Sequence, residues 1–136
     1  PWVLKRLGAA RAEAGAYVWH TLLASGAVVT NGTDVPVEDA DPIASFDATV
    51  RRKLPDGSEF YPAQKMTRDE ALRAYTASNA WAAFEEQEKG RLVPGMLADV
   101  TVLSRDIMTV PEDSIVGTKA VYTIVGGKIA YQAKAP

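Results

Sequence analysis

The stretch that decides the expected fold reads Ala27-Val28-Val29-Thr30-Asn31-Gly32-Thr33-Asp34. Residues 27–30 form a short apolar run after a helical pattern over residues 9–25, and Gly26 separates the two. An apolar run in this position is typical of a buried strand in a parallel sheet. We therefore expect Asp34 to follow the carboxyl end of a buried strand.

The residues that follow extend an α/β pattern. Helices are expected over residues 42–50 and 67–89. Asp41 followed by a proline is typical of a helix start, and Thr67 with a glutamate three residues later predicts a capping box. Residues 51–66 are polar and rich in turn residues, so we expect a surface loop there. The order of helix, strand, loop and helix predicts an α/β fold.

After residue 90 the sequence changes to a pattern of strands. Residues 99–103 are rich in β-branched side chains, which favour a strand. Residues 120–132 predict a hairpin, because Gly126-Gly127 can supply the positive φ angles of a tight turn. We therefore expect two units, an α/β unit over residues 1–90 and a β unit over residues 91–136.

Composition excludes several functions. The 136 residues include no cysteine and have a net charge of −2, which excludes disulfides and thiolate metal sites and argues against a nucleic-acid surface. The basic run at residues 51–53 is interpreted as a solvated loop rather than a clamp for an acidic substrate. Apolar runs are too short for a membrane span. Because the sequence starts at Pro1, we expect a processed chain or a piece of a longer one. The sequence does not determine the cellular compartment, and we favour the cytoplasm.

Asp34 is the main candidate for chemistry. A carboxylate at the carboxyl end of a buried parallel strand can bind a metal ion and accept a proton from bound water. Aspartate also caps turns, and the residues alone favour that structural role. Both interpretations remain open at this point.

The other candidates are weaker. Glu38, Asp39 and Asp41 could bind a hard cation, although a solvated loop and a helix N-cap are favoured. His20, the single histidine, has no partner at helical spacing, which favours a structural or surface role. A small hydrolase that uses His20 and Asp34 alone is therefore disfavoured.

Several motifs occur in series along the chain. They are Ala-Val-Val-Thr-Asn-Gly-Thr-Asp-Val-Pro-Val at residues 27–37, Asp-Pro at residues 41–42, the Thr…Glu-Ala-Leu…Tyr-Thr…Asn-Ala pattern of residues 67–80, the glycine and Ala-Asp pattern of residues 90–103, and Thr-Ile-Val-Gly-Gly-Lys-Ile at residues 123–129. This series resembles the metal-dependent amidohydrolase superfamily, and within it the branch that includes N-substituted formamide deformylase. Thr33 stands where that branch usually has serine.

The resemblance implies a fold and an activity. Residues 1–90 would be the last part of a (β/α)8 barrel, and residues 91–136 would be strands of a small β-sandwich domain. The parent protein would hydrolyse a non-peptide C–N bond in a small-molecule amide, formamide or cyclic amide, with a divalent metal ion, expected to be zinc. Asp34 would be the family's strand-eight aspartate, a metal ligand and general base, and Thr33 would help to orient it.

The sequence also departs from the family. The His-x-His of the first strand, the bridging Lys or Glu and the later histidines are absent, and a barrel needs about 250 residues. We therefore expect the chain alone to be inactive and to bind no metal stably. The alternative is a free-standing structural or interaction protein derived from such an enzyme. Open strand edges near Val28 predict self-association, and no nucleic-acid or membrane partner is expected.

Overall fold

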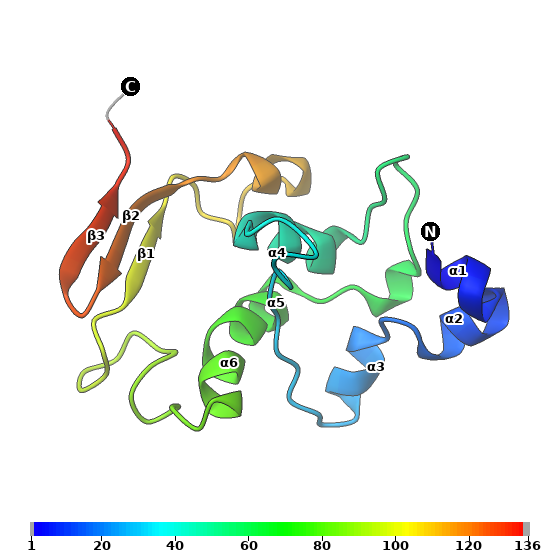
Figure 1. The fold of residues 1–136 in the computed structure, drawn as a ribbon, viewed down its shortest axis with the longest axis horizontal. Coiled ribbons are helices and arrows are strands. Elements are labelled where there is room, and N and C mark those ends of the chain that lie inside the picture. The colour runs from blue at the N-terminus through cyan, green and yellow to red at the C-terminus, as the bar shows by residue number, and fades with distance from the viewer. Residues whose placement is uncertain (1, 135–136) are drawn as a thin grey trace.

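The computed structural model describes residues 2–134, which form short helices followed by a small sheet. The α-helices are α1 (Trp2–Leu7), α2 (Ala9–Gly15), α3 (Trp19–Ala24), α4 (Pro42–Arg51), α5 (Arg68–Tyr75) and α6 (Ala77–Ala82). The 3₁₀ helices are η1 (Pro62–Gln64) and η2 (Glu112–Gly117), and the strands are β1 (Val100–Leu103), β2 (Ala120–Val125) and β3 (Lys128–Gln132). Figure 1 shows an extended arrangement, with α1–α3 at one end, the sheet at the other and α4–α6 between them.

Both predicted helix starts are confirmed. The carboxylate of Asp41 accepts hydrogen bonds from the backbone N–H groups of Ile43 (2.9 Å) and Ala44 (3.2 Å), which caps α4. At α5, the backbone N–H of Glu70 donates to Thr67 Oγ1 at 3.2 Å, and the backbone N–H of Thr67 donates to Glu70 Oε2 at 2.7 Å. These caps fix the starts of the two helices that form the centre of the molecule.

Two helices are shorter than predicted. The helix expected over residues 9–25 is interrupted at Tyr17, which has φ 55° and whose carbonyl accepts a hydrogen bond from Arg52 at 3.0 Å. The helix expected over residues 67–89 is interrupted at Thr76 (φ −121°, ψ −90°) and ends at Ala82. The hydroxyl of Thr76 donates to the Leu72 carbonyl at 2.8 Å, a local bond that competes with regular helix.

The strand expected at residues 27–30 is wrong, because these residues lie in irregular extended structure. A parallel strand needs a neighbouring strand, and the nearby Asn31 bonds to helices instead. The described residues therefore combine helices with one antiparallel sheet. The expected open strand edge near Val28 is absent for the same reason.

The sheet follows the predicted hairpin. It has three antiparallel strands in the order β1-β2-β3, with Thr101 opposite Thr123 and Thr123 opposite Tyr131. Gly126 and Gly127 have φ 56° and 76°, as the tight turn requires. The hairpin prediction is therefore confirmed.

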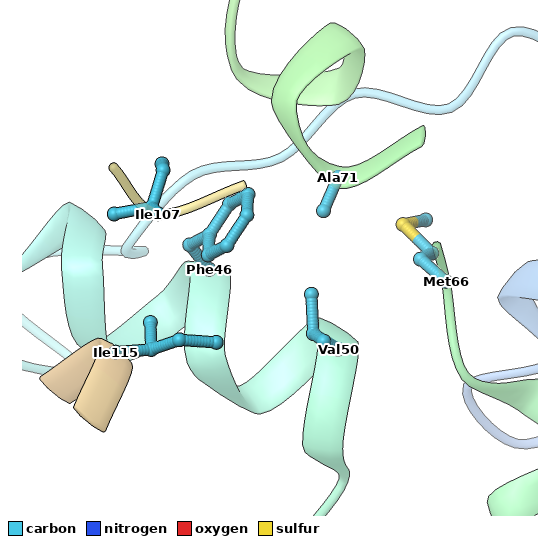
Figure 2. Packing of buried hydrophobic residues seen from close by; sticks show 6 residues of the cluster. All are labelled: Phe46, Val50, Met66, Ala71, Ile107 and Ile115. Carbon is cyan, nitrogen blue, oxygen red and sulfur yellow. The ribbon is translucent and has the colours of Figure 1, made fainter. Parts of the chain in front are cut away.

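The core lies around α4. Figure 2 shows Phe46 and Val50 of α4 packed with residues from four other segments of the chain. The buried cluster is Phe46, Val50, Met66, Ala71, Ile107 and Ile115. The guanidinium of Arg68 donates to the carbonyls of Ile107 (2.8 Å) and Val110 (2.6 Å), so the β1–β2 connection is tied to α5. The connection between β1 and β2 is thereby part of the helical core.

This core is small for the length of the chain. The accessible surface is 9346 Å², whereas a compact monomer of the same mass exposes about 6,900 Å². Large apolar side chains lie in the surplus surface; the most exposed are Trp2 (73%), Val37 (74%), Phe84 (93%) and Leu92 (75%). Trp81, near the end of α6, is also exposed (54%). These residues have too little of the chain around them to be buried.

Candidate functional site

Asp34 lies at the end of an extended segment, where the chain enters a turn. Its backbone is left-handed (φ 56°), a conformation that aspartate tolerates better than most residues, and its carbonyl accepts from the Val37 N–H at 2.8 Å. The Val35–Pro36 peptide bond within this turn is cis. The side chain is exposed, and within residues 2–134 its carboxylate receives no hydrogen bond, including none from Thr33. The predicted turn is present, but the carboxylate does not cap it.

The segment before Asp34 is held by helices. The backbone N–H of Asn31 donates to the Ala74 carbonyl at 3.0 Å, and Asn79 Nδ2 donates to the Asn31 carbonyl at 2.9 Å. Asn31 Oδ1 also accepts from the backbone N–H of Gly32 at 2.8 Å. The backbone N–H and the carbonyl of Asn31, three residues before Asp34, are therefore both hydrogen-bonded to helices.

The other acidic candidates do not join Asp34. Asp41 is committed to the α4 N-cap, and Glu38 and Asp39 are exposed in the loop. His20 is exposed on α3. Across the described part of the chain, no three His, Cys, Asp or Glu side chains gather as a metal centre would require. The described residues therefore do not make a metal centre by themselves.

Arg52 is a buried cation that sequence reasoning placed in a solvated loop. Its side chain is only 4% exposed, and its guanidinium lies 4.5 Å from the ring centre of Trp19 and 5.2 Å from that of Phe60. Its Nε–H donates to the Phe60 carbonyl at 2.6 Å. Burial lowers the pKa of Arg52. Trp19 and Phe60 are the sequence features that could have indicated a buried cation at this position. Through these contacts Arg52 joins α3, α4 and the loop after α4.

A groove of about 770 Å³ lies between α5–α6 and β1. Tyr75, Asn79, Lys89, Asp99 and Thr101 are among its lining residues. Burial raises the pKa of the Tyr75 hydroxyl. Asp34 does not line this groove, so the groove and the candidate carboxylate are separate features.

Within residues 2–134, every helix is too short or too polar to cross a lipid bilayer.

Comparison with known proteins gives consistent matches. A sequence profile described as the amidohydrolase family matches residues 1–131. A Bacillus subtilis (strain 168) protein named as an amidohydrolase, YtcJ, is 30% identical over 97% of this chain and 25% of its own length. The N-substituted formamide deformylase of Arthrobacter pascens is 29% identical over 83% of this chain and 21% of its own length.

Solved structures agree with the sequence matches. A crystal structure titled as a metal-dependent hydrolase from Pyrococcus horikoshii matches with a TM-score of 0.69 and 29% identity, over 82% of this chain and 23% of the other. The chain spans about a quarter of the length of the relatives it matches. Because the family profile covers nearly all of its residues, the chain belongs to the amidohydrolase family.

Proposed function

We propose that this chain is the C-terminal portion of a metal-dependent hydrolase that cleaves a C–N bond other than a peptide bond. The substrate class is a small-molecule amide, formamide or cyclic amide. The observation that carries this proposal is the family match over residues 1–131. In this proposal residues 1–90 complete a (β/α)8 barrel and residues 91–136 contribute strands to a β-sandwich.

Asp34 is the residue of this chain to which we assign the chemistry. Its carboxylate is exposed and has no hydrogen-bond donor among the described residues, while the backbone before it is fixed by α5 and α6. An exposed carboxylate that no hydrogen-bond donor occupies is available to accept a proton from an attacking water. We further propose that Asp34 is one ligand of a divalent metal ion, with zinc the first candidate. The remaining ligands would come from outside the described residues.

The surplus surface supports an origin in a larger protein. The apolar side chains exposed in the loop after α6, such as Phe84 and Leu92, have no cover within residues 2–134. The rest of the parent protein would cover them. The chain alone would then lack both the other catalytic groups and part of its packing, so we expect it to be inactive.

The test is Asp34→Asn in the full-length protein that carries this chain. Hydrolysis is followed as amine release from N-substituted formamides and linear amides, and as formation of the ring-opened carboxylic acid from cyclic amides. Loss of the general base should lower kcat by about 10²–10⁴-fold. The matched control is Asp39→Asn, a nearby exposed carboxylate, which should leave kcat within about twofold. Full activity of the Asp34→Asn protein would refute the assignment.

The alternative is a free-standing, non-catalytic interaction protein, and the exposed Phe84 and Leu92 are the observation that favours it. Such a protein would bury these side chains against a second copy or another chain. The mass of the native polypeptide decides between the two. A native chain several times longer than 136 residues supports the hydrolase, and a native chain of this length that elutes as an oligomer supports the alternative.

A further inference from the structure

We propose that Asn79 of α6 is a positioning residue that sets the place of the Asp34 carboxylate by holding the backbone of Asn31. This inference rests on the proposed function of Asp34. The side-chain amide of Asn79 is half-buried, and its Nδ2 donates to the Asn31 carbonyl at 2.9 Å and to the Tyr75 carbonyl at 3.3 Å. One amide group thereby joins α5, α6 and the segment that leads to Asp34.

The helix break at Thr76 provides the second half of the attachment. The last carbonyls of a helix have no partner within it, and the carbonyl of Ala74 near the end of α5 accepts from the Asn31 N–H at 3.0 Å. A continuous helix through Thr76 would engage that carbonyl. Both backbone polar groups of Asn31 are therefore bound by the two helices, in the way that a neighbouring strand binds a residue in a sheet.

The attachment limits how far Asp34 can move. Asn31 precedes Asp34 by three residues, which span about 10 Å even when fully extended. The backbone N–H of Gly32 donates to Asn31 Oδ1 at 2.8 Å, and the turn after Asp34 is closed by the Val37 N–H. No strand pairing supports residues 27–34. The Ala27 N–H donates to the Leu22 carbonyl of α3 at 3.2 Å and Val29 packs against the core, so the bonds at Asn31 are the link to the helices that lies nearest to Asp34.

The chemistry of the asparagine amide is specific. Nδ2 faces two carbonyl oxygens, so this position needs a side chain that donates hydrogen bonds. Aspartate has the same shape but would place an oxygen against those carbonyls. Alanine removes the donor without adding repulsion. Asn79→Ala therefore reports the loss of the hydrogen bond to Asn31. Asn79→Asp reports that loss together with repulsion that displaces the segment before Asp34.

The experiment uses the full-length protein with Asn79→Asp, Asn79→Ala and the control Ser78→Ala. Ser78 is the neighbour of Asn79 on α6, and its side chain takes part in no hydrogen bond among the described residues. We expect both Asn79 variants to lower kcat by about 10–100-fold with little change in KM, since misplacing a reacting group by about 1 Å has an effect of this size. Ser78→Ala should keep kcat within about threefold.

A second measurement separates positioning from general stability. Hydrogen exchange of the Asn31 amide should become faster in both Asn79 variants and remain unchanged in Ser78→Ala, at a temperature where all three proteins are folded. Asn79 variants that keep kcat and Asn31 protection, in a protein that Asp34→Asn inactivates, would overturn this inference alone. If Asp34→Asn is active, the proposed function fails first, and hydrogen exchange at Asn31 still reports whether Asn79 holds the segment.

Discussion

Replacing Gly90 by alanine should destabilise the protein through a close contact with α6. Gly90 has φ +92°, and an added Cβ would lie 2.7 Å from the Cβ of Ala80 and 3.2 Å from the Cα of Ala77. A side chain in left-handed backbone costs about 1–2 kcal/mol. Overpacking of a tight contact adds about 1–3 kcal/mol. We therefore expect the free energy of unfolding to fall by about 2–5 kcal/mol.

The control for this prediction is Gly57→Ala. Gly57 has a similar left-handed backbone (φ +84°), but an added Cβ would have no atom within 4 Å, so the loss should be about 1–2 kcal/mol. Urea denaturation followed by circular dichroism gives both values. Ala80→Gly in the Gly90→Ala background removes the nearest atom and should recover part of the difference. Equal losses for Gly90→Ala and Gly57→Ala would refute the contact argument.

Two further predictions concern the core and its edge. Ile115 is fully buried, so Ile115→Ala should lower the free energy of unfolding by about 2–5 kcal/mol, whereas Val116→Ala, at a half-exposed neighbour, should change it by less than about 1 kcal/mol in the same urea assay. Burial raises the pKa of Asp47 above 3.8, against the opposing effect of Arg51. The stability linked to this raised pKa is present below the ordinary carboxyl pKa and is lost as the pH rises through the folded-state value. Asp47→Asn should therefore raise Tm at pH 7 relative to the unchanged protein and show a smaller gain at about pH 3, and a lower Tm at pH 7 would contradict the argument.

The features that the sequence predicted correctly are those determined by neighbouring residues. Asp41 caps the first turn of α4, and Thr67 with Glu70 forms the box at α5, because each cap bonds backbone groups within the next few residues. The hairpin at Gly126 follows from the φ angles of two consecutive residues. Such features depend little on the rest of the chain.

The features that sequence reasoning missed depend on distant contacts. The interruption at Tyr17 lies where its carbonyl bonds Arg52, and the guanidinium of Arg52 is buried only because Trp19 and Phe60 enclose it. Residues 27–30 have the composition of a strand but no strand to pair with in the described residues. Residue pattern alone does not reveal which partner a backbone group will find.

In the candidate site, too, some features follow from the sequence and others depend on distant contacts. Asp34 was identified from its place after an apolar run and from the family resemblance, and the structure adds that its carboxylate is free and exposed. The role of Asn79 was not predicted, because it depends on the break at Thr76 and on the position of Asn31 relative to α6. The Tyr-Thr and Asn-Ala motif of residues 75–80 marks this helix in the sequence. The hydrogen bonds of Asn79 to the Asn31 and Tyr75 carbonyls are seen only in the structure.

The size of the surplus surface helps to decide between the two hypotheses, a portion of a hydrolase and a free-standing interaction protein. The surplus over a compact monomer is about 2,400 Å², whereas a standard interface removes about 800 Å² from each partner. A transient docking patch would expose far less, whereas obligate interfaces remove about 1,000–2,500 Å² from each partner. A surplus of this size, spread over side chains as far apart in sequence as Trp2 and Ile129, matches an extensive permanent interface. This argues that the chain completes its fold against other protein, as the proposed hydrolase requires.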